Sequence, residues 1–298
     1  MSRYRHVSAM KADGFPIDAA CAAAEVSTSA YYDWLARSAV PTEADWDEAL
    51  RVNEMHRVHD HLDDTYGSPR MTDELRRRGF RANHKRVERL MAEHAIYAKD
   101  GRRKKVRTTI PDVSAPPLPD LVKRDFSVGE PGHRTCGDIT YIGTEEGWLY
   151  LADVLDLGSR RVIGYAMGER MPWELVGRAL EMAVATRGGE VAGMIFHHDR
   201  GAQYMGKDFR ALCTEHEIAQ SVGRIGSSQD NAVAESFWAS LKRELVSRYR
   251  FETRAEARRA IIAWINHYNA MRLHGSLGNV PPIEWELRHF QAQMDQAA

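Results

Sequence analysis

Three acidic residues in the second half of the chain have a spacing that could support metal-dependent chemistry. Asp138 opens the β-rich run GDITYIGT, and Asp199 directly follows the buried run AGMIFHH. Sixty residues lie between these two aspartates, and thirty-five lie between Asp199 and Glu235. Parallel neighbouring strands would bring both strand ends to one sheet edge, where open α/β sheets carry their chemistry. Glu235 lies one position off the apolar stripe of a later helical segment, so it can lean toward the same edge.

Carboxylates at this edge would need a cation. A lone buried carboxylate is costly, and three converging ones repel one another. Oxygen ligands without thiols or paired histidines favour Mg²⁺, with Mn²⁺ as its substitute. Two such ions about 3.5 to 4 Å apart stabilise the attacking and leaving oxygens of a phosphodiester displacement. The pattern predicts nuclease or strand-transfer chemistry, although each acid taken singly is more simply a helix cap or a surface charge.

Short β-rich runs followed by helical segments must position these residues. From about residue 128 we expect three consecutive strands, a helix, a strand, a helix, a short strand and a helix. In order these are GDITYIGT, GWLYLADVLDL, RVIGYAMG, WELVGRALEMAVATRG, AGMIFHHD, KDFRALCTEHEI, AQSVG and AVAESFWASLKRELV. The order predicts a ribonuclease H-like α/β fold, followed by a last helix over RAEARRAIIAWINHYNAMR.

The positive charge of the chain is concentrated upstream of these elements. The whole chain has a formal charge of −1, which by itself predicts no nucleic-acid binder, but residues 70–107 hold 14 Lys or Arg against 5 Asp or Glu. Within this block, MTDELRRRG and HKRVERLMAEHAI predict a helix pair in which Gly79 ends the first helix and Asn83 caps the second. This spacing is typical of a helix-turn-helix.

An inner apolar face of the pair would leave basic side chains free to meet DNA phosphates. The inner face comprises Leu75, Val87, Leu90 and Met91, and the outward cations are Arg76, Arg77, Arg81, Lys85, Arg86 and Arg89. A structural helical hairpin with a solvated charged face remains an alternative.

A linker follows the helix pair. It carries the basic cluster Arg102, Arg103, Lys104 and Lys105 and then four prolines between Pro111 and Pro119. The cluster could follow a DNA backbone or minor groove, or simply form an exposed hinge. Further upstream we expect two short helices within residues 17–36, the second capped by Ser27, and a longer amphipathic helix over 44–62. The predicted parts are a helical segment 1–43, a helix-turn-helix domain 44–98, a linker 99–127 and a catalytic core 128–298.

Composition excludes several classes of protein. The three cysteines form no C-x-x-C pair, which excludes a cysteine-based zinc module and is typical of a reducing compartment. No eighteen consecutive residues are apolar, and the first fifteen lack the apolar stretch of a signal peptide. We therefore expect a cytoplasmic protein, associated with the nucleoid when bound to DNA and without a membrane partner.

The acidic spacing, followed by Lys242 seven positions after Glu235, resembles the DDE motif of transposases and retroviral integrases. The segments GDITYI, HHDRGAQY, SSQDNAVAESFWASLKREL and NHYNAMRLHGSLGNVPPIEW, with YGSPRMTDELRRRG upstream, sharpen the likeness. They resemble the catalytic subunit, the second-frame product, of bacterial insertion sequences whose transposase is made by frameshifting. The resemblance covers about residues 50–287.

The resemblance implies that Asp138, Asp199 and Glu235 are the catalytic, metal-binding triad, with Mg²⁺ as cofactor and two ions in the site. Lys242 would share a helical face with Glu235 and contact a terminal phosphate or base. The implied activity is binding of terminal inverted repeats, metal-dependent 3′-end cleavage and strand transfer. The implied partners are DNA, further copies of the chain on DNA, and a first-frame helix-turn-helix protein.

The chain departs from the family pattern at two positions. Thr135 stands where a tryptophan is usual, and Gln229 stands where an aromatic is common before Asp230 and Asn231. Neither position carries a charge that the chemistry requires, and Asp230 can be explained as a helix cap. Two other functions compete with the transposase: a catalytically silent helix-turn-helix regulator and a simple nuclease on the same fold. The acidic triad disfavours the first, and the basic region with Lys242 disfavours the second.

Overall fold

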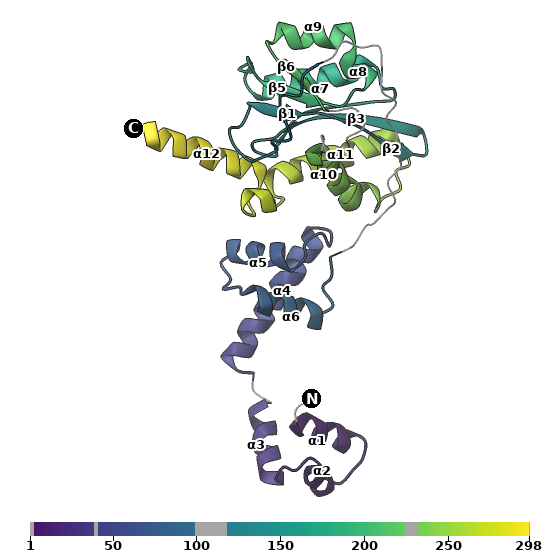
Figure 1. Ribbon diagram of the computed structural model, residues 1–298. Coiled ribbons are helices and arrows are strands. Elements are labelled where there is room, and N and C mark those ends of the chain that lie inside the picture. The colour runs from purple at the N-terminus through teal and green to yellow at the C-terminus, as the bar shows by residue number, and fades with distance from the viewer. Residues whose placement is uncertain (1–2, 39–40, 99–117, 224–231, 298) are drawn as a thin grey trace. The chain divides into compact units, whose positions relative to one another are not determined.

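The computed structural model describes residues 3–38, 41–98, 118–223 and 232–297, and the chain divides into two compact units, Met1–Ala98 and Lys99–Ala298. Figure 1 shows the first unit as helices only and the second as a sheet between helices. No helix in the described ranges is long and apolar enough to cross a membrane.

The first three helices pack around a small core of their own. They are α1 (Arg3–Ala12), α2 (Ile17–Ala23) and α3 (Thr28–Ser38). Val7, Ala20, Cys21 and Tyr31 form this core. Ser27 caps α3 as expected, because its hydroxyl accepts a hydrogen bond from the amide of Ala30 at 3.1 Å. Helix α1 was not among the expected elements.

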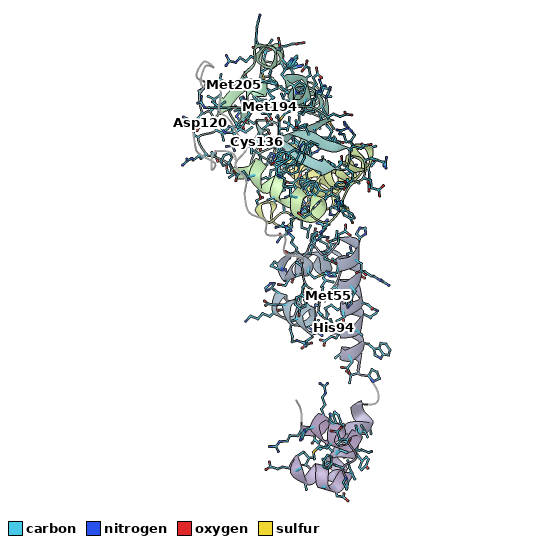
Figure 2. All side chains as sticks on the ribbon, turned by 90° about the vertical axis from the view of Figure 1, so that its right-hand side faces the viewer. Met55, His94, Asp120, Cys136, Met194 and Met205 are labelled. Atoms are coloured by element: carbon cyan, nitrogen blue, oxygen red, sulfur yellow. The ribbon has the colours of Figure 1, made fainter. Side chains whose placement is uncertain are left out.

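The helix pair expected from the basic block is confirmed. Helix α4 (Glu43–His61) is followed by α5 (Ser68–Arg77) and α6 (His84–Glu93). Gly79 follows α5 with φ of 85°, a left-handed conformation that glycine adopts without strain. Asn83 caps α6 by accepting a hydrogen bond from the amide of Lys85 at 3.0 Å. The expected inner face is buried together with Met55 of α4, which is labelled in Figure 2.

The second unit is built on one mixed sheet. Its strands are β1 (Arg134–Cys136), β2 (Ile139–Thr144), β3 (Gly147–Asp156), β4 (Val162–Gly168), β5 (Ile195–His198) and β6 (Ala219–Val222). Strand β3 is antiparallel to β4 on one side and to β1 and β2 on the other, and β1, β5 and β6 run parallel.

The expected first strand, GDITYIGT, begins only at Ile139 as β2, and the short strand β1 before it was not expected. Gly137 and Asp138 form an interruption between these two strands, which keep one register on β3 because Cys136 lies opposite Leu155 and Ile139 lies opposite Ala152. A Cβ atom at Gly137 would collide with the ring of Phe196 and with the carbonyl oxygen of Asp153. Glycine therefore lets neighbouring strands approach closely at the interruption.

Helices cover both faces of the sheet, as Figure 1 shows. Helices α7 (Trp173–Thr186), α8 (Ala202–Met205) and α9 (Lys207–Glu215) bury one face, and α10 (Ala232–Leu241) and α11 (Arg254–Ala270) bury the other. Cys136, labelled in Figure 2, lies in the core between the sheet and helices α10 and α11. This arrangement confirms the α/β fold expected from the element order.

The end of the chain forms a further helix, α12 (Pro282–Ala297), beyond the last helix expected from the sequence. Arg187 fixes it to the sheet, because its guanidinium lies 2.7 Å from Asp156 and 2.6 Å from Glu286 of α12. Both carboxylates are almost fully buried. A second guanidinium, that of Arg161, lies 2.7 Å from Glu286.

Residues 118–127, the last part of the expected linker, lie against the sheet. Val122 is buried in the main core, and the amide of Leu121 donates to the hydroxyl of Ser221 at 2.9 Å. The amide of Val222 donates to the carbonyl of Pro119 at 3.1 Å. The four-part division of the chain stays a prediction.

Candidate active site

Strand register brings Asp138 and Asp199 together. Strands β1 and β5 are parallel neighbours, with Cys136 opposite His197. The same offset in sequence relates Asp138 to Asp199, and the amide of Gly137 continues the ladder by donating to the carbonyl of His197 at 2.9 Å. Both aspartates therefore lie just beyond the carboxyl ends of adjacent parallel strands, the edge at which open α/β sheets bind ligands.

Both oxygens of the Asp138 carboxylate accept a hydrogen bond. Oδ1 accepts one from the amide of Ile139 at 2.8 Å, and Oδ2 accepts one from the indole Nε1 of Trp238 at 3.1 Å. Burial and then the negative charge of Asp199 raise the pKa of Asp138 to about 7, against the lowering effects of these hydrogen bonds and of Lys242. The carboxylate is thus held in place and is electrostatically under-compensated.

Asp199 has a similar environment. Its Oδ1 accepts a hydrogen bond from the amide of Gly201 at 2.9 Å, and burial raises its pKa. The preceding His198 is buried, its Nδ1 lies 2.6 Å from the carbonyl oxygen of Asp199, and its ring stacks on Tyr204. Burial lowers the pKa of His198 to about 3, so its imidazole is neutral at ordinary pH and supports the backbone of Asp199.

A further acid, Asp153 of β3, lies opposite Asp138 and was not among the expected site residues. It is 1% exposed, and its Oδ1 accepts a hydrogen bond from the backbone amide of Asp138 at 3.0 Å. Its Oδ2 is buried with no hydrogen-bond partner among the described residues. Burial, and then Asp138, raise the pKa of Asp153 well above its usual range. The available sequence signal was a charged residue inside the apolar run YLADVLDL.

Glu235 is in the first turn of α10 and is half-buried. Trp238 of the same helix donates a hydrogen bond to Asp138, and this bond holds α10 beside the aspartate pair. Within the ranges that the structure describes, however, no three His, Cys, Asp or Glu side chains are close enough to hold one metal ion. The structure therefore brings Asp138 and Asp199 together, and the assignment of Glu235 to the same site stays a prediction. Mutual repulsion of three carboxylates disfavours that cluster unless a cation lies between them.

Lys242 begins a π-helical turn, Lys242–Val246, that directly continues α10. Its Nζ lies 5.7 Å from the ring centroid of Tyr141 in β2. Partial desolvation lowers the pKa of Lys242, and attraction by Asp138 opposes that shift. The lysine is thus an electrostatic neighbour of the aspartate pair, and π-helical turns of this kind are frequent at functional sites.

Comparison with known proteins agrees with this geometry. An integrase core domain matches residues 129–228 and again 216–282, and an HTH-like domain matches residues 45–105. The chain is 34% identical over 288 residues to the transposase InsF of insertion sequence IS3A from Escherichia coli (strain K12), covering 93% of this chain and 96% of that protein. This chain belongs to the IS3 family of transposases.

A second relative of this transposase is the uncharacterized 31 kDa protein of insertion element IS600 from Shigella sonnei. The two are 37% identical over 272 residues, which cover 91% of this chain and 98% of that protein. Among solved structures, the catalytic core domain of BIV integrase is 18% identical, covers 55% of this chain and 99% of that chain, and has a TM-score of 0.41. The family assignment rests on the sequence relatives.

The donor set of the transposase fits a hard divalent cation. Asp138 and Asp199 offer carboxylate oxygens, which Mg²⁺ and Mn²⁺ prefer over softer ligands. Burial and mutual repulsion raise the pKa of Asp138, so a cation between the two groups would relieve a cost built into the fold. The nearby cysteine, Cys136, is fully buried on the core side and its pKa is raised, so it offers no thiolate.

Several cations expected to face DNA are paired with acids of their own unit. Glu48 of α4 lies 2.9 Å from Arg86 and 3.0 Å from Arg89, and these hydrogen bonds and charges lower the pKa of Glu48. Arg76 lies 2.9 Å from Asp73. Arg77 pairs with Glu74 at 4.0 Å, and Lys85 is exposed at the start of α6.

Among the remaining positions named in the sequence analysis, Thr135 lies within the described residues. Thr135, the departure from tryptophan, is fully buried and its hydroxyl donates to the carbonyl of Ile195 at 3.0 Å, so it joins β1 to β5. The other positions lie outside the described residues: Arg102, Arg103, Lys104, Lys105, Gln229, Asp230 and Asn231.

Proposed function

We propose that this transposase cleaves the 3′ ends of its insertion sequence and joins them to target DNA at a site formed by Asp138, Asp199 and Glu235. The observation that supports this most strongly is the pair of repelling aspartates at adjacent parallel strand ends, with α10 anchored beside them. In this proposal Glu235, one turn before Trp238 on α10, completes the ligand set when a divalent cation offsets the carboxylate charges.

Two Mg²⁺ ions, or Mn²⁺ in their place, would supply charge stabilisation for the attacking and leaving oxygens of an in-line displacement. The chain's own residues supply position. Trp238 and the amide of Ile139 orient the Asp138 carboxylate, and the amide of Gly201 orients that of Asp199. Lys242 neutralises a DNA phosphate next to the scissile bond.

The reaction then needs no covalent enzyme intermediate. In cleavage, a water oxygen bonds to phosphorus and loses a proton to solvent, while the bond from phosphorus to the 3′ oxygen breaks and that oxygen takes up a proton. In strand transfer, the freed 3′ hydroxyl loses its proton and attacks a target phosphodiester, and the displaced target 3′ oxygen takes up a proton. Strand transfer forms one phosphodiester for the one it breaks, so no nucleotide cofactor is consumed.

The helix pair α5 and α6 would bind the terminal inverted repeats through its basic residues, with Arg102 to Lys105 following the backbone. Because Arg86 and Arg89 are paired with Glu48, binding would exchange those ion pairs for phosphates. We further propose that the transposase acts in the cytoplasm as a homo-oligomer on DNA, with a first-frame helix-turn-helix protein as a possible partner.

The decisive test substitutes one ligand. Asp199→Asn keeps the shape of the side chain and should retain binding to duplexes carrying the element's ends while losing Mg²⁺-dependent nicking. Asp208→Asn, a change at an exposed aspartate of α9, is the matched control and should nick normally. Nicking by purified Asp199→Asn at the wild-type rate would overturn the assignment, as would a phosphate-linked enzyme trapped on a suicide substrate.

A further inference from the structure

An aromatic pair is exposed beside the proposed active site. Tyr141 of β2 is 38% exposed and Trp148 of β3 is 53% exposed, with ring centroids 4.9 Å apart in a T-shaped arrangement. Large aromatic surfaces are usually buried, where they contribute most to stability. Two of them in mutual contact at the surface therefore need a reason other than core packing.

The β2–β3 hairpin holds this pair in a fixed place. In the antiparallel register Trp148 lies opposite Gly143, and a Cβ atom on that glycine would lie 3.5 Å from the indole ring. Because Gly143 has no side chain, the indole can lean across it toward Tyr141, two residues earlier on the same face of β2. The aromatic surface is thus part of the rigid sheet.

Tyr32 is also an exposed aromatic with a lysine over its ring, but the lysine beside Tyr141 differs because it is Lys242, a neighbour of Asp138. Its ammonium lies 5.7 Å from the centroid of the Tyr141 ring, within the range of a cation–π contact. The same ammonium is attracted by Asp138, three residues before Tyr141. An aromatic ring, a cation and a proposed catalytic carboxylate are therefore neighbours, because the ammonium of Lys242 interacts with both Tyr141 and Asp138.

We propose that Tyr141 and Trp148 form a stacking platform for an unpaired nucleobase of the DNA strand being processed, with Lys242 on the phosphate beside that base. Aromatic side chains next to a cation are the combination with which proteins hold single-stranded DNA, because every base has a face to stack and every nucleotide has a phosphate. The platform rests on the proposed DNA-cleaving function and adds a binding site for a base separated from its complement.

The occupant is a nucleobase and not a protein surface, for two reasons. The pair lies beside the carboxylates at which the DNA strand must arrive, and its adjoining charge is positive, complementary to phosphate. A protein partner bound on the same rings would block Lys242 from that strand.

The test uses the full-length chain in buffer with EDTA and two fluorescein-labelled 20-base-pair duplexes. One carries a 3′ overhang of three adenines, and the other carries three abasic residues in the same place. The wild-type chain should bind the adenine overhang about tenfold more tightly. Tyr141→Ala and Trp148→Ala should lose most of this preference, and Tyr141→Phe should keep it. Phe290→Ala, at an exposed aromatic of α12 that also makes a T-shaped ring contact, is the control and should keep it.

The outcomes separate this inference from the function on which it rests. A wild-type chain that binds both duplexes equally, or alanine variants that fold normally by circular dichroism and keep the tenfold preference, would overturn the platform. Alanine variants that keep the preference but change the mass of the assembly would show that the rings contact another protein, which also overturns it. The catalytic assignment is tested separately, because Asp199→Asn should lose nicking and keep the preference for adenines.

Discussion

The substitution Trp238→Phe tests the positioning of Asp138 separately from the packing of α10. The substitution removes the indole N–H that lies 3.1 Å from Asp138 Oδ2 and retains an aromatic ring in the core. A hydrogen bond to a charged group contributes about 1.5–3 kcal/mol, and each 1.4 kcal/mol corresponds to a factor of ten. If the bond orients the carboxylate during the reaction, the Mg²⁺-dependent nicking rate should fall at least about tenfold.

Trp264→Phe is the matched control for this experiment. Trp264 lies in the same core cluster and is nearly as buried as Trp238, but its indole nitrogen has no hydrogen-bond partner among the described residues. Both variants lose the same atoms, but Trp238→Phe also loses a hydrogen bond, so its free energy of unfolding should drop further in urea denaturation. Only Trp238→Phe should lose nicking in single-turnover assays. Equal nicking rates in the two variants would refute the idea that Trp238 positions Asp138.

Three further predictions concern the rest of the chain. Arg187→Met leaves two buried carboxylates without their shared cation and should lower the free energy of unfolding by about 3–5 kcal/mol, whereas Arg250→Met, at an exposed ion pair, should leave the urea midpoint unchanged. Burial raises the pKa of Asp153, so the folded chain keeps a proton that the unfolded chain loses as the pH rises above the carboxyl's usual 3.8, and stability falls with rising pH. Asp153→Asn should therefore stabilise the chain at pH 8 and not at pH 3, and an equal gain in thermal midpoint at both values would contradict this. Replacing Lys85, Arg86 and Arg89 of α6 by alanine should weaken binding to the element's ends. It should also reduce the slope of log affinity against log salt concentration by roughly 0.9 for each phosphate that is no longer neutralised. An unchanged slope in fluorescence titrations would show that these residues do not recognise the ends.

The aspartate pair could be anticipated from the sequence because its geometry depends on a few strong local signals. Asp138 and Asp199 each adjoin a β-rich run, and parallel pairing of those runs is enough to place them side by side. The helix pair was predictable for the same reason, since Gly79 and Asn83 have the conformations and hydrogen bonds that their residue types favour.

Features that depend on contacts between distant parts of the chain could not be predicted in this way. The break between β1 and β2 follows from the approach of Phe196 to Gly137, and the role of Asp153 follows from the antiparallel register of β3. The ion pairs of Glu48 with the arginines of α6 join residues about forty positions apart. Helix α12 is fixed through Arg187, almost a hundred residues earlier.

The position of Glu235 is the part of the site that stays a prediction. Spacing groups it with the two aspartates, and among the described residues no three His, Cys, Asp or Glu side chains form a group that could hold a metal ion. Mutual repulsion disfavours convergence of three carboxylates unless a cation is present, so the proposed ligand set depends on the metal.

Crystals of the full-length transposase soaked in Mn²⁺ would test the three-carboxylate site most directly. We expect anomalous density at the carboxyl ends of β1 and β5, within coordination distance of Asp138, Asp199 and Glu235. Density confined to other residues, or an occupied aspartate pair from which Glu235 stays apart, would contradict the proposed site.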